Sequence, residues 1–181
     1  IIYQISRPPP TERFFTQSGR KQRNNKRVNF MGWFNYYGLA ILAVIMIPNI
    51  IFAVKNKDGF KNSYRNKAVE IAEQIGRYGC FALTVINIPY TYFNFWFDGA
   101  LIAYLSVNGA LLIAYLAFWI IYRKKDGVAK ALALSIIPTC IFIFDGIVLA
   151  YIPLIAFSII FGVSHILLSY KNAVAAKETE E

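Results

Sequence analysis

The chain has few of the residues from which soluble enzymes build their sites. It contains one histidine and two cysteines, and only 16% of its 181 residues are charged. Cys80 and Cys140 lie far apart in apolar runs, without the spacing of a metal or redox site. The nucleotide-binding GxxxxGK[ST] pattern, the HExxH of zinc proteases and the GxSxG of serine hydrolases are all missing from the sequence. We therefore expect no enzyme activity, no cofactor and no bound metal.

Apolar sequence, in contrast, is abundant. Hydrophobic residues make up 57% of the chain, and the charged residues fall into short clusters separated by long uncharged runs. A soluble domain of this size would not carry so much apolar surface. The pattern is typical of membrane-spanning helices joined by short loops. It predicts an all-α integral membrane protein with about five transmembrane helices.

The net charge of +9 comes largely from one end of the chain. Seven of the nineteen Lys and Arg residues precede residue 31, and residues 31–181 carry 12 basic and 9 acidic groups. The later basic residues flank apolar runs, where retention on the cytoplasmic side of a membrane explains them. We therefore predict the lipid bilayer, and no nucleic acid, as the partner of this surface.

Residues 1–30 are predicted to be a disordered basic leader. They contain a triple proline and no apolar run long enough for a signal peptide. Met31 directly precedes the first apolar run, and codons for Lys26 to Val28 could form a bacterial ribosome-binding sequence. We expect the native protein to start at Met31, with a transmembrane domain over 31–171 and a short charged cytoplasmic tail over 172–181.

The apolar runs predict three spans, at 33–54, 77–97 and 99–122, and two more within 131–170. Basic residues follow the first and third spans, and Lys171 follows the last. Because basic loops are retained in the cytoplasm, all three belong on one side. We expect a multi-pass protein of the bacterial cytoplasmic membrane with its N-terminus out and its C-terminus in.

An internal resemblance bears on the last two spans. Residues 97–105 and 144–152 are identical at five of nine positions, including an Asp-Gly pair in each. A true repeat would give one helix followed by two related helical hairpins, with the last turn at Asp145, which would then cap a helix at the outer interface. A turn near 151–153 would instead leave Asp145 inside the membrane. Only there would it be a strong functional candidate.

Four polar residues in the apolar runs are candidates for lining a solute path. Polar groups at mid-membrane near proline breaks are typical of transporter sites, although hydrogen bonds between helices are the alternative use. Asn108 lies on the same helix face as Tyr104 and Tyr115. A carboxylate near the histidine would favour an enzyme. The candidates are Asn49, Asn87, Asn108 and His165.

Two further patterns concern packing. Small residues recur every three or four positions along the third span and predict either a central packing helix or a dimer seam. They are Gly99, Ala103, Ser106, Ala110, Ala114 and Ala117. Glu73 and Arg77 are four residues apart, a spacing that permits an ion pair on one helix face at the membrane interface.

These features predict a non-enzymatic carrier or channel for a small solute, acting as a homo-oligomer. The alternative is a non-catalytic subunit or regulator that packs into a larger membrane complex through the small residues of the third span.

Overall fold

The computed structural model describes residues 32–55, 64, 66–122 and 127–180. The predicted leader, residues 1–30, lies outside these described ranges. Five α-helices form within them: α2 (Tyr36–Lys55), α3 (Lys67–Val85), α4 (Ala100–Ile121), α5 (Val128–Val148) and α6 (Ile152–Glu180).

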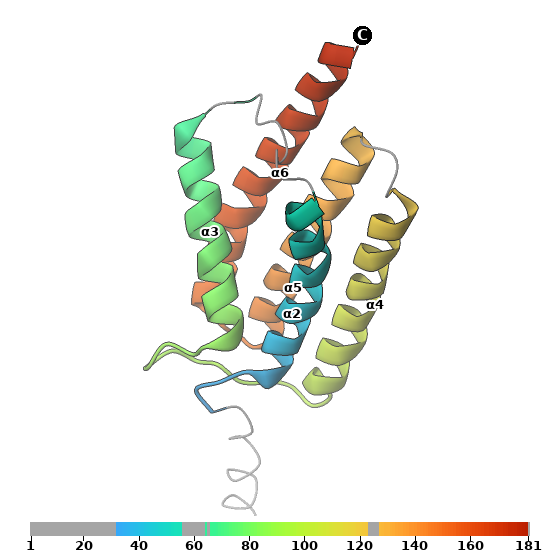
Figure 1. Cartoon of the computed structure of the whole chain (residues 1–181). Helices are drawn as coiled ribbons and strands as arrows, with labels where there is room; N and C mark the ends of the chain where they lie inside the picture. The colour runs from blue at the N-terminus through green and yellow to red at the C-terminus, as the bar shows by residue number, and fades with distance from the viewer. Residues whose placement is uncertain (1–31, 56–63, 65, 123–126, 181) are drawn as a thin grey trace, which may run out of the picture.

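The five helices alternate in direction along one bundle axis (Figure 1). Residues 32–35, the 86–99 segment and the α5–α6 turn gather at one end, called the aromatic end below. The other end carries Lys55, Lys67 and the C-terminal part of α6. The prediction of an all-α membrane protein with about five helices is confirmed. The segment after residue 171 is mostly helical, because α6 continues to Glu180.

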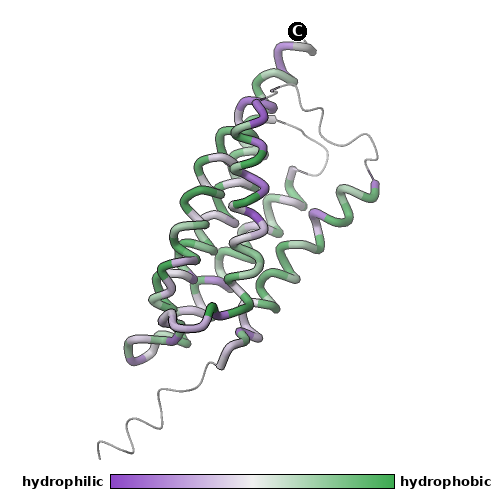
Figure 2. The backbone as a smooth tube through the Cα atoms, turned by 90° about the vertical axis from the view of Figure 1, so that its left-hand side faces the viewer, coloured by the Kyte–Doolittle hydropathy of each residue, from purple (hydrophilic) through white to green (hydrophobic). Residues whose placement is uncertain are grey.

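Composition marks α2, α4, α5 and α6 as long and apolar enough to cross a membrane, but not α3. Helix α3 contains Lys67, Glu70, Glu73 and Arg77, and Figure 2 shows hydrophilic segments interrupting it. It nevertheless returns the chain from the end of α2 to the start of α4. Its 19 residues cover about 28 Å at 1.5 Å per residue, close to the thickness of a hydrocarbon core. The length and course of α3 therefore fit the predicted fifth crossing.

The predicted second span, 77–97, is wrong at its C-terminal end. The helix starts at Lys67, where the Asn66 side chain accepts from the Ala68 and Val69 amides, and it ends at Val85. Ile86 is extended and forms an antiparallel bridge with Phe34. Pro89 explains the stop, because a proline disfavours helical geometry at the residue before it and offers no amide hydrogen.

The last turn lies at Leu149 to Tyr151, so the alternative with the turn at Asp145 is wrong. Asp145 is still helical, and Ala150 takes the positive φ of 49° that reverses the chain. The Tyr151 amide donates to the Gly146 carbonyl at 2.8 Å, as at many helix ends. Pro153 then sits in the first turn of α6, where proline is well tolerated.

The related-hairpin hypothesis fails in the same region. Asp98 and Gly99 precede helix α4, and Gly99 is its N-cap, whereas Asp145 and Gly146 lie in the last turn of α5. The matching residues therefore occupy different structural positions.

Helix α5, and not α4, is the central packing helix. It contacts α3, α4 and α6 and is the most buried of the four apolar spans. Helix α3 packs closely on α6 at Gly76, where an added Cβ would lie 2.7 Å from the Phe161 backbone nitrogen and Cα. Because real Cβ atoms do not come so close to backbone, only glycine permits this approach.

The 86–99 segment covers the aromatic end of the bundle. The rings of Phe93 and Tyr151 lie 4.9 Å apart, and those of Phe95 and Tyr104 5.6 Å apart. The Trp96 indole donates to the Ile147 carbonyl at 3.0 Å. This segment, the aromatic cap, closes the bundle over the buried residues described next.

Candidate functional site

A buried carboxylate, Asp145, lies beneath the aromatic cap. It is fully buried (0% exposed) in the last turn of α5. Tyr104 donates its hydroxyl to Asp145 Oδ2 at 3.0 Å, and Asn108 donates its amide to Asp145 Oδ1 at 2.7 Å. Both donors come from α4, where a spacing of four residues places them on one face.

Asn35 completes this group, which we call the Asp145 cluster: Asn35, Tyr104, Asn108 and Asp145. Asn35 precedes α2, and its Oδ1 accepts from the Gly38 amide at 3.0 Å, as a helix N-cap does. Its amide nitrogen donates to the Thr84 carbonyl at 3.1 Å and to the Tyr104 hydroxyl at 3.4 Å. One polar network thus joins α2, α3, α4 and α5.

A buried cation occupies the opposite end of α5. Lys130 is only 5% exposed, and its Nζ lies 5.6 Å from the Trp119 ring centre and 5.9 Å from that of Phe52. Such positions over aromatic faces stabilise an ammonium group. One turn before Trp119 on α4, Tyr115 donates its hydroxyl to Asn49 Oδ1 at 3.2 Å. Lys130, Trp119, Phe52, Tyr115 and Asn49 are the Lys130 cluster.

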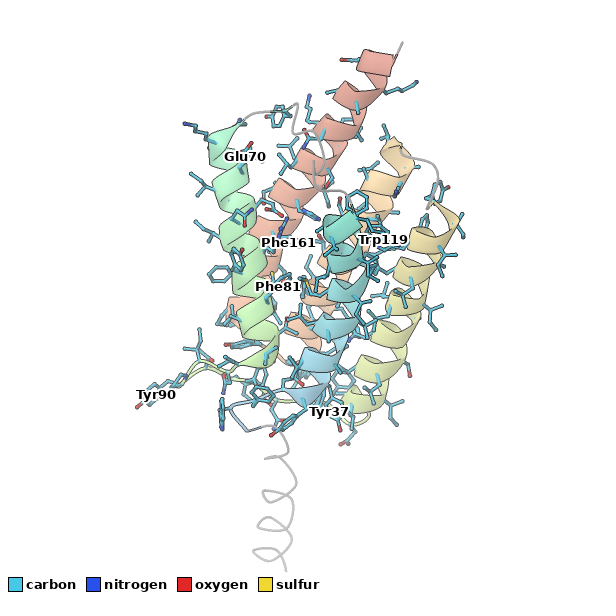
Figure 3. All side chains as sticks on the ribbon, viewed as in Figure 1. Tyr37, Glu70, Phe81, Tyr90, Trp119 and Phe161 are labelled. Atoms are coloured by element: carbon cyan, nitrogen blue, oxygen red, sulfur yellow. The ribbon has the colours of Figure 1, made fainter. Side chains whose placement is uncertain are left out.

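The two clusters share one face of α4. Tyr104, Asn108, Tyr115 and Trp119 follow one another at spacings of four, seven and four residues, so they project toward the same side. Lys130 and Asp145 are fifteen residues apart on α5, or about 22 Å along a helix. Between the clusters α2 and α4 pack apolar side chains, among them Ile41, Ile45, Leu111 and Leu112. Figure 3 shows Trp119 near the Lys130 end, between α2 and α4.

A second buried carboxylate, Glu73, lies between α3 and α6 and is 1% exposed. Arg77 donates to Glu73 Oε1 from Nε at 2.9 Å and also from Nη2. His165 Nδ1 lies 3.0 Å from the same oxygen. The His165 ring stacks on Phe161, with ring centres 4.6 Å apart. Glu73 therefore lies deep in the α3–α6 contact, and it pairs with Arg77 four residues along α3.

The predicted polar lining is dispersed. Asn108 and Asn49 belong to the two clusters on the α4 face, and His165 lies with Glu73 on the other side of the bundle. Asn87 is not in a span, because it follows the end of α3. The backbone N–H of Asn87 donates to the Trp33 carbonyl at 2.9 Å, and the side-chain Oδ1 of Asn87 accepts from Thr91 Oγ1 at 3.0 Å. It holds the aromatic cap together.

Within the described ranges, the small residues of the third span do not form a packing face. Ser106, Ala110 and Gly99 are exposed, and Ala103, Ala114 and Ala117 are only partly buried. The buried face of α4 consists of Ala100 and the larger side chains Tyr104, Asn108 and Tyr115. The stripe remains available for contact with another molecule.

A groove of about 460 Å³ opens between α5 and α6, away from both clusters. Its walls are almost entirely apolar and include Leu132, Ile143, Ile159 and Leu167. On a transmembrane bundle such a surface faces lipid, so we place no polar ligand there.

Sequence reasoning missed Asn35, Tyr104 and Lys130 as site residues. Two signals could have found them. Asn35 directly precedes an apolar helix, which is typical of an N-cap. Tyr104 lies one turn before Asn108, so the two share a face. Lys130 reads as a loop residue because it lies so close to the basic segment at 123–125.

No family model, curated protein or solved structure matches the chain. Its function must therefore be inferred from the buried polar groups of this helical membrane protein.

Proposed function

We propose that the protein is a carrier for a small polar solute or ion, with its path along the α4 face between α2 and α5. The observation that supports this most is the buried Asp145, held by neutral side chains inside an apolar span. Ionisable residues in transmembrane segments are rare and usually belong to ion or substrate pathways. The basic residue Lys130 lies at the other end of the same face, so the path has two distinct polar ends.

Apolar packing between the two clusters supports a carrier over a permanently open channel. Ile41 and Ile45 on α2, which lie between the two clusters, are buried in the hydrophobic core. Helices α2 and α5 contain Pro48 and Pro138, which interrupt helical hydrogen bonding. Transporters use such interrupted helices to open one end of a path at a time. We assign the described arrangement to a closed state.

The test uses the purified full chain in liposomes. Stopped-flow light scattering reports swelling when a solute enters, and an internal pH dye reports proton entry. A panel of small sugars, amino acids, ammonium and potassium salts covers the solute class. We expect faster entry of at least one solute or of protons than in protein-free liposomes. Rates equal to those of empty liposomes for the whole panel and for protons would contradict the proposal.

A matched pair of variants locates the path. Asn108→Leu removes a buried donor on the proposed path, whereas Ser106→Leu changes an exposed residue at nearly the same depth of α4. Losing a hydrogen bond worth 1–2 kcal/mol slows a step roughly tenfold. We expect that loss in Asn108→Leu and an unchanged rate in Ser106→Leu. Equal effects in both variants would exclude the α4 face as the path.

The exposed small residues of α4 favour a second candidate, a non-catalytic subunit or regulator. Small side chains let two transmembrane helices approach closely, and this stripe has no such partner among the described residues of its own chain. Native mass spectrometry of the protein extracted mildly from its host separates the candidates. A homo-oligomer supports the carrier, and a stable complex with a different protein supports the subunit.

The Glu73–His165 contact is the kind of pair that would favour an enzyme, yet we propose no catalysis there. Glu73 Oε1 is already shared by Arg77 and His165. Cys80 and Ser158, whose side chains contact one another, lie seven residues away on each helix, about 10 Å along the axis, and the Ser164 hydroxyl beside His165 donates to backbone carbonyls of α6. A catalytic base must reach its partner within hydrogen-bond distance.

A further inference from the structure

Asp145 is a carboxylic acid without a neutralising cation in the described part of the chain. Its two oxygens accept from Tyr104 and Asn108, which are both uncharged. Burying an ionised carboxylate is costly, and a hydrogen bond from a neutral donor offsets only a small part of that cost. Two such bonds leave the ionised form unfavourable.

In the described ranges, the polar groups around Asp145 are uncharged. Helix α4 contributes the phenol of Tyr104, and the start of α2 contributes Asn35, which reaches Thr84 on α3. At the α5–α6 turn the titratable group is Tyr151, whose hydroxyl is engaged with the Ile86 and Ile88 backbone. The basic residue on α5 is Lys130, about 22 Å away along the helix.

The amide of Asn108 supplies a second, independent observation. Its Oδ1 is buried and has no hydrogen-bond partner among the described residues, although its Nδ2 donates to Asp145. A buried acceptor without a donor destabilises the folded protein. The atom that lacks a donor thus belongs to the group that already faces the carboxylate.

Protonation of Asp145 would remove both unfavourable features, namely the buried negative charge and the unpaired Asn108 Oδ1. A protonated Asp145 has an O–H that can donate to Asn108 Oδ1 while Asn108 Nδ2 continues to donate to Asp145 Oδ1. Acid and amide then form two parallel hydrogen bonds. The protonated oxygen keeps a lone pair that can accept from Tyr104. A metal ion fits less well, because hard cations take six or more oxygen ligands, and the described residues contain no cluster of acidic, histidine or cysteine ligands.

We propose that Asp145 is a proton-binding site, occupied at neutral pH, with Asn108 as the partner of the bound proton. The role of that proton in transport rests on the carrier function proposed above, in which it is the coupled ion. Release of the proton would require Asp145 to gain water or a cation, which the aromatic cap excludes in the closed state.

Infrared spectroscopy of the full chain in lipid bilayers tests protonation without any transport. We expect a carboxylic-acid carbonyl band at pH 7 that disappears in Asp145→Asn. Two controls should keep the band: Asp98→Asn, at an exposed aspartate, and Glu73→Gln, at a carboxylate paired with Arg77. A missing band at pH 7, or a band that survives Asp145→Asn, would overturn the proposal.

Asn108→Leu supplies a second readout, which also decides if Asp145→Asn does not fold. Loss of the amide acceptor weakens the hydrogen bonding of the acid, so its carbonyl band should move to higher frequency. An unchanged band position would contradict the acid–amide pair. A band at pH 7 in a protein that moves nothing across liposomes would uphold the proton site and remove the carrier function, so the two failures are distinguishable.

Discussion

The two buried carboxylates of this bundle are equally hidden from solvent but are balanced in opposite ways. Glu73 is 1% exposed and contacts Arg77 and His165, whereas Asp145 is 0% exposed and contacts only neutral donors. Glu73 lies between α3 and α6 with the Arg77 counter-charge beside it, which is a structural use of charge. Among the residues that the structure describes, Asp145 has no counter-charge in contact, which is typical of a group that binds an ion or a proton.

The largest loss of stability is expected when Glu73 loses its charged partner Arg77. Arg77→Leu leaves a buried carboxylate with His165 as its remaining basic contact. Removing one partner of a buried pair costs 3–5 kcal/mol, and we expect about 3 kcal/mol because the Arg77 side chain is 37% exposed. Thermal unfolding in detergent measures the loss. A change below about 1 kcal/mol, the range of surface pairs, would show that Glu73 does not depend on Arg77.

An intermediate effect is expected from separating α3 and α6, which hold the Glu73 pair. Gly76→Ala forces its new Cβ against the Phe161 backbone and should cost about 2 kcal/mol by overpacking. Gly109→Ala is the matched control, since no atom lies within 4 Å of a Cβ there. It should be neutral or stabilising by up to about 1 kcal/mol. Equal unfolding temperatures for the two variants would contradict the close helix contact.

The smallest effect is expected at Asp145. Asp145→Asn keeps the shape of the side chain and resembles the neutral acid, so we expect unfolding to change by less than about 1 kcal/mol at pH 7. Proton-coupled transport should be lost in the same variant. A destabilisation as large as that of Arg77→Leu would mean that Asp145 is ionised in the resting protein, which would remove the contrast between the two sites.

Hydropathy was sufficient for the fold class and for the bounds of the first and third spans, because α2 and α4 are continuous apolar runs. It failed at residues 86–97, where an apolar and aromatic sequence forms the cap and not a helix. Pro89 was visible in the sequence, but the backbone pairing of Phe34 with Ile86 joins segments far apart in the chain. A local sequence pattern cannot predict pairing between segments that are distant in the chain.

The candidate sites were predictable only where both partners lie on one helix. Glu73 and Arg77 are one turn apart, and so are Tyr104 and Asn108. The contacts of Asp145 with α4 and of His165 with α3 depend on how helices distant in sequence pack together. Gly76 and Gly38 were overlooked as positions of close helix contact. The longer stripe of small residues on α4 predicted close packing at a face that is exposed or only partly buried among the described residues.

The composition of α3 has a consequence for how the protein enters its membrane. Charged residues at the centre of a helix oppose insertion by the translocation machinery by about 2.5–3.5 kcal/mol each. Glu73 and Arg77 can offset one another early, but His165 is on α6, which is synthesised after α3, α4 and α5. We expect nascent α3 to rest at the membrane surface until α6 emerges, so that the insertion of α3 is completed by a later rearrangement.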